Sequence, residues 1–284
     1  EGKCRYTPLH LACDCMAPLE IVSLLVKAFP DSLKEHCWRI GTPLHVACEH
    51  SAPLEIVSML LESWPDAVKQ KEEWDGHTPL HKASMYGSLE VVSLLLDSWP
   101  DALHEADGEG FTPLHTACRF NTVEIVSLLL SKWPDPLQEM NEYGNNKLLD
   151  IACDFSEEVE VIYLLLNKWI GAKENRNIPV LKTLEYKLYS GDLYRCVSDF
   201  INDFEVSNTR ATDIMSFFIQ ARMWNSVFWV VDKYPITTRF MKPQTNEMGN
   251  FLALVGIKCS LLTMWEVIQN EQELLRGAEY SINI

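Results

Sequence analysis

The 284-residue chain has little positive charge. It holds 24 lysines and arginines against 40 aspartates and glutamates, which gives a formal net charge of -16 at pH 7. A field of that sign repels phosphate backbones and anionic lipid surfaces, and it attracts basic partners. We therefore expect no nucleic-acid ligand, and a protein partner with a basic surface is favoured.

The sequence also lacks a long hydrophobic run. The longest apolar stretch, from Phe251 to Trp265, is interrupted by Lys258 and falls short of the roughly 20 apolar residues that a membrane-spanning helix needs. Residues 1–5 carry no apolar segment of the kind found in signal peptides, and a repeat motif begins at Thr7. We expect no direct membrane insertion, and a chain whose start has been truncated or processed.

Catalytic and metal-binding motifs are missing as well. The chain has no Gly-rich phosphate loop with Lys-Ser/Thr, no H-E-x-x-H and no G-x-S-x-G, and its acidic residues are spread in repeat phase. Cys13 and Cys15 form a C-x-C pair, but no second pair or histidine follows at the spacing of a zinc site. We therefore expect no metal, no cofactor and no enzymatic activity.

The cysteine pattern argues against a disulfide framework. The nine cysteines are an odd number. Four of them recur at one repeat position that is expected to lie inside a packed helix, namely Cys13, Cys48, Cys118 and Cys153. Buried free cysteine acts as a small hydrophobe. The pattern favours a reducing, intracellular compartment, with the cytoplasm preferred and the nucleus or an organelle interior left open.

Internal repetition is the dominant feature that is present. The tetrapeptide Thr-Pro-Leu-His occurs at residues 7–10, 42–45, 78–81 and 112–115, at intervals of 35, 36 and 34 residues. An apolar run with Glu at its second position recurs at residues 19–26, 54–61, 89–96, 123–130 and 159–166. An aromatic residue followed by Pro-Asp closes four units, and Trp169-Ile170-Gly171 is a degenerate fifth example. Three markers in one phase make a chance origin negligible.

The pattern of each unit predicts two short helices and a connecting finger. Thr can cap the first helix because its side-chain oxygen can accept a hydrogen bond from a backbone N–H that has no partner within the helix. Pro suits the first helical position because it lacks the backbone N–H that would be left unpaired there. In the second helix, apolar residues such as Leu89, Val92 and Leu95 recur at helical spacing. The Pro after the closing aromatic should end that helix, and Gly-containing sequences such as residues 108–110 predict a hairpin-like turn.

These motifs resemble the ankyrin repeat family, whose signature contains Thr-Pro-Leu-His-x-Ala in a unit of about 33 residues. The resemblance covers roughly residues 4–172. It implies a curved solenoid in which helix pairs stack and the fingers project to form a concave surface. The aromatic-Pro-Asp ending stands where the family commonly has Gly-Ala-Asp, and this variant resembles ankyrin proteins abundant in diatoms and related algae.

We predict one continuous all-α, ankyrin-repeat α-solenoid of about eight helix pairs with short hairpin-like fingers. Residues 1–172 hold five recognisable repeats, and the fifth is weakened at residues 147–150, where Lys-Leu-Leu-Asp replaces the motif. Residues 173–284 are expected to hold three divergent repeats and a C-terminal cap, with helix pairs at 180–204, 212–234 and 251–275 and a longer loop at 241–249. Divergence is expected there because a terminal repeat must cover an otherwise exposed apolar face.

Two rows of repeated side chains invite a functional interpretation. The resemblance implies that the motif histidines are hydrogen-bonding braces between a helix start and the adjacent finger: His10, His45, His81 and His115. The closing aromatics are expected to pack in the core between repeats, where large rings bury the most area, and an exposed ladder for ligand stacking is the alternative: Phe29, Trp64, Trp99, Trp133 and Trp169.

Positions that break the repeat phase are the candidate binding residues. The resemblance implies partner contacts from the finger tips, here Trp38, Arg39, Trp74, Asp75, His77, Glu109, Phe111, Glu142 and Tyr143. It also implies contacts from the inner side of the first helices, here Glu49, His50, Met85, Tyr86, Arg119, Phe120 and Phe155. Aromatic residues, Met and Arg anchor interfaces when they are desolvated. The alternative is that some of these rings only pack against a neighbouring finger.

The residues therefore favour a protein-protein interaction module or scaffold that binds a partner protein on the concave surface of fingers and first helices. A structural subunit packed permanently in a large multiprotein assembly is the alternative, indicated by the aromatic residues between 217 and 229. An enzyme would need a cleft for which the sequence gives no sign.

Overall fold

The computed structural model describes residues 6–120, 123–133, 147–155, 159–171 and 208–220, together with Met223, 226–227 and 230–231. The chain divides into two compact units, residues 1–141 with 154–161, and residues 142–153 with 162–284. The described residues form helices and turns without a named strand. None of the described helices combines the length and the apolar character that crossing a membrane requires.

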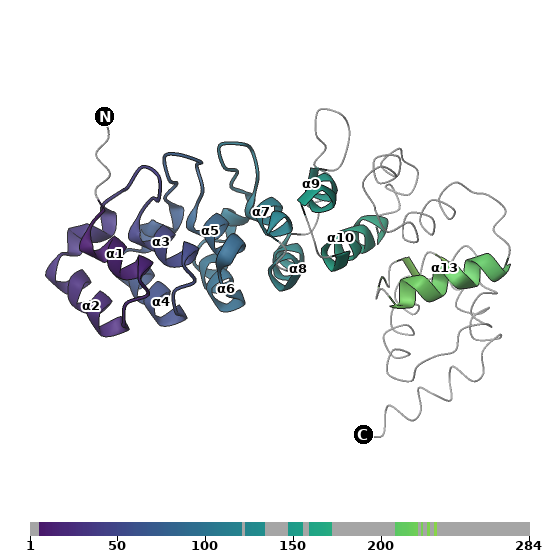
Figure 1. The fold of residues 1–284 in the computed structure, drawn as a ribbon, viewed down its shortest axis with the longest axis horizontal. Coiled ribbons are helices and arrows are strands. Elements are labelled where there is room, and N and C mark those ends of the chain that lie inside the picture. The colour runs from purple at the N-terminus through teal and green to yellow at the C-terminus, as the bar shows by residue number, and fades with distance from the viewer. Residues whose placement is uncertain are drawn as a thin grey trace, which may run out of the picture. The chain divides into compact units, whose positions relative to one another are not determined.

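Four helix pairs stack side by side in the first unit (Figure 1). The first helices form one row: α1 (Pro8–Asp14), α3 (Pro43–Glu49), α5 (Pro79–Tyr86) and α7 (Pro113–Arg119). The second helices form the other: α2 (Leu19–Ala28), α4 (Leu54–Ser63), α6 (Leu89–Ser98) and α8 (Val123–Lys132). Each helix contacts its counterpart in the next pair, which confirms the helical solenoid over the first four repeats.

Each first helix begins as the Thr-Pro-Leu-His motif predicts. The N-caps are the four motif threonines, and each has Pro at the start of the helix: Thr7, Thr42, Thr78 and Thr112. In every case the threonine side chain accepts from the backbone of the motif histidine, whose ring accepts from the threonine backbone N–H. This reciprocal capping box satisfies two orphan donors at each helix start.

Each of the first three second helices ends two residues before Pro, and the residue between them is the C-cap: Phe29, Trp64 or Trp99. The Pro then opens a short 3-10 helix that the sequence pattern had not indicated: η1 (Pro30–Lys34), η2 (Pro65–Lys69) and η3 (Pro100–His104). Each 3-10 helix buries an aliphatic side chain, Leu33, Val68 or Leu103. Each also contacts the first helix of the following pair, α3, α5 or α7, so it is part of the interface between repeats.

The fifth repeat shows what happens without that Pro. Its helices are α9 (Lys147–Phe155) and α10 (Val159–Gly171). The marker Trp169-Ile170-Gly171 lies inside α10, which runs for 13 residues where α8 has 10. Because Ile170 keeps the backbone donor that Pro lacks, the helix continues for another turn.

Cysteine packs in the core of the first unit as expected. Cys13, Cys48 and Cys118 are buried free thiols. Burial raises the pKa of Cys13 to about 12 and also raises the pKa values of Cys48 and Cys118. The side chain of Cys153 lies outside the described residues. Cys37 departs from the expectation of a chain without disulfides, because it is disulfide-bonded.

The closing aromatics do not share one environment. Trp133 is 9% exposed and packs edge-on against His104 of η3, with ring centroids 4.6 Å apart. Trp64 and Trp99 are half-buried, whereas Phe29 is 63% exposed. The prediction of core packing is therefore confirmed at Trp133 and wrong at Phe29. Phe29 belongs to the first helix pair, which has no preceding pair among the described residues. The side chain of Trp169 lies outside the described residues.

In the second unit, α13 (Asn208–Gln220) begins four residues before the predicted helix start at Thr212. Phe218 is fully buried, and Phe217 packs edge-on against Tyr163 of α10 with centroids 6.0 Å apart. These two rings therefore contribute to packing within their own unit. The helix pairs expected at 180–204 and 251–275 and the loop at 241–249 lie outside the described residues.

Candidate partner-binding surface

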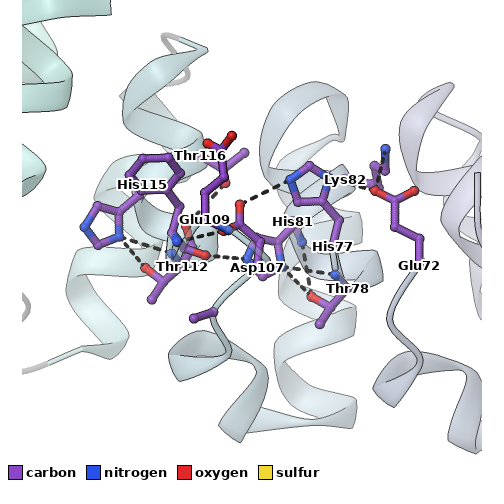
Figure 2. A network of polar contacts seen from close by, with 12 residues as sticks. Glu72, His77, Thr78, His81, Lys82, Asp107, Glu109, Thr112, His115 and Thr116 are labelled. Carbon is purple, nitrogen blue, oxygen red and sulfur yellow. Dashed lines mark hydrogen bonds and ion pairs between the residues drawn. The ribbon is translucent and has the colours of Figure 1, made fainter. Parts of the chain in front are cut away.

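The motif histidines hold the fingers against the first helices (Figure 2). The Nε2 atoms of three of them lie 3.2, 3.1 and 3.0 Å from the backbone oxygen of the residue that precedes the next motif threonine: His10 to Gly41, His45 to His77, and His81 to Phe111. Since Nδ1 accepts from the threonine backbone N–H, Nε2 carries the proton and donates to the carbonyl. The expected bracing role is confirmed, so this row is framework.

Burial keeps these histidines neutral. It lowers the pKa of His45 to about 3 and that of His81 to about 4, and it also lowers the pKa of His10. The brace requires a neutral ring, because Nδ1 can accept a hydrogen bond only when it is unprotonated. Groups with pKa values this far below neutrality are poorly matched to acid-base chemistry at pH 7.

A buried ionic network joins the second, third and fourth repeats (Figure 2). His77 lies between two carboxylates, with Nδ1 2.8 Å from Glu72 Oε1 and Nε2 3.4 Å from Asp107 Oδ2. The Nζ atom of Lys82 lies 3.2 Å from Glu72 Oε1 and 3.5 Å from Glu49 Oε2. Burial on its own would raise the pKa of Glu72, but His77 and Lys82 hold it below its usual value.

The sequence interpretation placed His77 at a finger tip and missed its partners. Its side chain is only 12% exposed, and both ring nitrogens face carboxylates, so it positions two fingers and presents little surface. A signal was available at Lys82, which follows the motif histidine where the other repeats have Leu11, Val46 and Thr116. A charged residue at a position that is buried in the neighbouring repeats implies buried partners of opposite charge.

The same cluster contains a possible cation site. Glu72, Asp75 and His77 each offer a ligand atom, and these atoms lie within 4.8 Å of one another. However, the ammonium group of Lys82 already lies against Glu72, and His77 is already paired with two carboxylates. We assign Glu72 and His77 to the network that holds the fingers, and the absence of a metal ligand stays a prediction.

Neighbouring fingers contact each other directly. The backbone N–H of Gly108 donates to the Asp75 carbonyl at 2.7 Å, and Lys71 Nζ lies 2.8 Å from Glu105 Oε2. Gly76 has a φ of +71°, and a Cβ at this position would lie 3.0 Å from the Gly108 nitrogen, so glycine suits both the turn and the close approach. The second and third fingers therefore support each other at their tips.

Two aromatic groups lie on this framework. The first, here called the finger cluster, consists of Trp38, Arg39 and Trp74. The two indole rings meet edge-on with centroids 4.8 Å apart, and the Arg39 guanidinium lies 5.7 and 5.4 Å from them. This confirms the alternative in which rings pack against a neighbouring finger. Trp74 is nevertheless 57% exposed, which leaves much of its surface for a partner.

The second group, here called the helix-one cluster, consists of Tyr86, Arg119, Phe120 and Phe155. The rings of Tyr86 and Phe120 lie 5.6 Å apart, and the Arg119 guanidinium lies 5.9 Å from Phe120 and 4.9 Å from Phe155. All three rings are exposed, by 46% for Tyr86, 37% for Phe120 and 52% for Phe155. The cluster thus presents aromatic surface from α5, α7 and α9.

The remaining candidates have different surroundings. Asp75 and Glu109 are exposed and Met85 is half-buried. Phe111 belongs partly to the framework, because its N–H donates to Asp107 Oδ1 at 2.8 Å and its carbonyl receives the His81 brace. Glu142 and Tyr143 lie outside the described residues. The structure therefore brings seven candidates into two clusters and assigns His77 and part of Phe111 to support.

Comparison with known families agrees with this architecture. A family model described as ankyrin repeats in three copies matches residues 9–103, 44–143 and 100–178, which together cover well over half of the 284-residue chain. Among curated proteins, none matches the chain. The matched region contains the helix pairs, the fingers and the histidine braces described above. The chain belongs to the ankyrin repeat family.

Proposed function

We propose that the chain is a protein-protein interaction module whose partner binds across the finger cluster and the helix-one cluster. Ankyrin repeats are generally modules of this kind. The observation that carries the proposal is the exposure of three large rings on a braced framework, with Trp74 at 57%, Tyr86 at 46% and Phe155 at 52%.

Exposed rings on a rigid support are effective anchors for a partner. Each aromatic side chain can bury about 150 to 250 Å², and its association costs less entropy when the ring is already held in place. Here Trp74 is held by Trp38 and Arg39, and Tyr86 by Phe120. Hot spots at interfaces are enriched in Trp, Tyr and Arg, and the two clusters contain these types.

The charge around the clusters favours a basic partner. Arg39 and Arg119 lie over aromatic rings, whereas Glu73, Asp75 and Glu109 at the finger tips are exposed. Together with the net charge of -16, these carboxylates would attract a partner that carries Lys or Arg beside an apolar anchor.

A permanent structural subunit is the weaker candidate. The aromatic residues that suggested it include Phe217 and Phe218, which pack within their own unit. Ankyrin repeats are also typically non-enzymatic, and we propose that this chain has no catalytic activity. A reducing location inside the cell remains a proposal. The free buried thiols of Cys13 and Cys48 favour it, and the disulfide-bonded Cys37 counts against it.

The test is site-specific photo-crosslinking in native extract. A photoreactive amino acid replaces Trp74 or Tyr86, and the matched controls replace Leu54 or Leu89, which begin α4 and α6 and are 38% and 41% exposed. We expect the same partner to be captured from positions 74 and 86 and not from 54 and 89. Equal capture from all four positions would show that the partner does not bind at the clusters.

A further inference from the structure

The lysines and arginines on the fingers and first helices of the first four repeats differ in their partners. Both lysines are paired with acids of the chain, since Lys71 Nζ lies 2.8 Å from Glu105 and Lys82 Nζ lies 3.2 Å from Glu72. The two arginines, Arg39 and Arg119, have neither a hydrogen bond nor an ion pair with any residue that the structure describes. This is unexpected in a chain that holds 40 acidic residues against 24 basic ones.

Each arginine lies instead over two rings of its own cluster. The Arg39 guanidinium is 5.7 and 5.4 Å from the ring centroids of Trp38 and Trp74 in the finger cluster. The Arg119 guanidinium is 4.9 Å from that of Phe155 in the helix-one cluster. A ring attracts the cation but supplies no oxygen acceptor. Both side chains are exposed, so their N–H donors stay available to an acceptor from outside the chain.

A partner that binds at the clusters removes water from these two guanidinium groups. To cover the Trp74 ring is also to cover the group 5.4 Å from it, and the same holds for the group 4.9 Å from Phe155. A buried charge that has lost its water and has no partner is strongly destabilising. Since the described residues offer Arg39 and Arg119 no acceptor, the partner has to supply one at each position.

A carboxylate is the acceptor that suits an arginine in this setting. The planar guanidinium presents paired donors that match the two oxygens of a carboxylate, and the contact neutralises both charges. A backbone carbonyl would leave the positive charge uncompensated. A phosphorylated side chain would bring nearly two negative charges to finger tips that already expose Glu73, Asp75 and Glu109.

We propose that the partner segment carries an Asp or Glu beside each of its apolar anchors, with one carboxylate bound by Arg39 and the other by Arg119. This inference rests on the proposed function, because it holds only for a partner that covers the two clusters. The rings already hold both arginines in place, which lowers the side-chain entropy lost on binding.

The acids of the partner are compatible with a basic partner overall. The net charge of -16 acts at long range and attracts a protein with a basic surface. Arg39 and Arg119 act only on contact, and they determine where on that surface an acid must stand. A segment with basic residues alone would leave both arginines unpaired, so the two clusters discriminate against it.

The experiment selects binders from a display library of random peptides, with the full chain as the target. Peptides are kept when they bind the parent chain and fail to bind the chain with Trp74→Ala and Tyr86→Ala. We expect Asp or Glu to be enriched next to the apolar residues of the retained peptides. When that acid is replaced by Asn or Gln in the synthetic peptide, fluorescence anisotropy should show binding weakened by about 10-fold or more.

Arginine variants then identify the group that each acid meets. For an acid bound by Arg119, the change from acid to amide in the peptide should alter binding to the Arg119→Gln chain by only about 2-fold or less. Arg39→Gln serves in the same way for the other acid. The matched control, Lys27→Gln, removes one positive charge from an exposed position of α2 and should behave like the parent chain.

The outcomes separate this inference from the proposed function. Retained peptides without enriched acids would overturn the inference while leaving the binding surface in place. An acid-to-amide change that weakens binding equally in the parent chain and in both arginine variants would do the same. If no selected peptide depends on Trp74 or Tyr86, the proposed function itself is wrong and the inference falls with it.

Discussion

The first and third repeats share one sequence motif but differ in their surroundings. In the first repeat Leu11 is 51% exposed, whereas Lys82, at the same position of the third repeat, is only 7% exposed. The leucine has no helix pair of the described chain before it, while the lysine lies between the carboxylates of Glu49 and Glu72. Burial in a stacked array is thus set by the neighbouring repeat, and hydrophobicity alone does not determine which residues are inside.

The largest effect on stability is expected at Lys82. Lys82→Met would leave the buried carboxylate of Glu72 without its ammonium partner, and breaking a buried ion pair costs about 3 to 5 kcal/mol. Urea unfolding followed by circular dichroism measures the change. The matched change in the first repeat, Leu11→Lys, should alter stability by about 0.5 kcal/mol or less because the site is exposed. A neutral Lys82→Met would show that the network contributes little to the stack.

A second comparison uses two leucines at the same helical position. Leu95 is fully buried in α6, whereas Leu25 in α2 is half-buried. Leu95→Ala should cost about 2 to 5 kcal/mol through the cavity that it leaves, and Leu25→Ala should cost clearly less. The free energies of unfolding of both variants can be compared with that of the parent chain. Equal losses would mean that the first repeat is covered as completely as the third.

The next largest effect is expected from acidification, which should lower the folding stability of the repeats that the motif histidines brace. Burial holds the folded-state pKa of His45 at about 3 and that of His81 at about 4, below the unfolded value of about 6.5. Between these values the unfolded chain binds more protons than the folded chain, so stability falls as the pH falls from 6.5 toward 4. Each histidine should contribute a loss of about 2 kcal/mol between pH 7.5 and pH 5.

Urea titrations at pH 7.5, 6.5 and 5 would measure this slope. His81→Gln is the matched control, because glutamine can keep the capping box but does not titrate. The variant should be less stable at neutral pH, since it loses the donor to the Phe111 carbonyl, and its stability should depend less steeply on pH. A slope identical to that of the parent would mean that His81 is not held neutral by the fold.

The features that could be predicted from the sequence are those that depend on interactions between residues close together in the chain. The helix starts follow from Thr and Pro acting within one turn, and the ends of the second helices follow from the Pro after Trp64 or Trp99. The ionic network could not be foreseen in the same way, because stacking brings Glu49, Lys82 and Asp107 together from three repeats. The core packing predicted for Phe29 was wrong for the same reason, because its exposure depends on whether a neighbouring helix pair covers it.

The candidate surface was foreseen in outline. The aromatic residues that break the repeat phase were expected to be exposed, and Trp74, Tyr86 and Phe155 are. Their grouping into two clusters, each with an arginine over the rings, depends on the distance between successive fingers and helices. The distance between successive fingers and helices cannot be predicted from a single amino-acid sequence.

The most direct measurement is the affinity for the cross-linked partner of a chain that carries both Trp74→Ala and Tyr86→Ala. Calorimetry should show binding weakened by about 30-fold or more, as expected when hot-spot rings are removed, with the unfolding free energy changed by about 1 kcal/mol or less. The paired control, Leu54→Ala with Leu89→Ala, should bind like the parent chain. Unchanged affinity in the Trp74 and Tyr86 variant, or an equal loss in the control, would contradict binding at the two clusters.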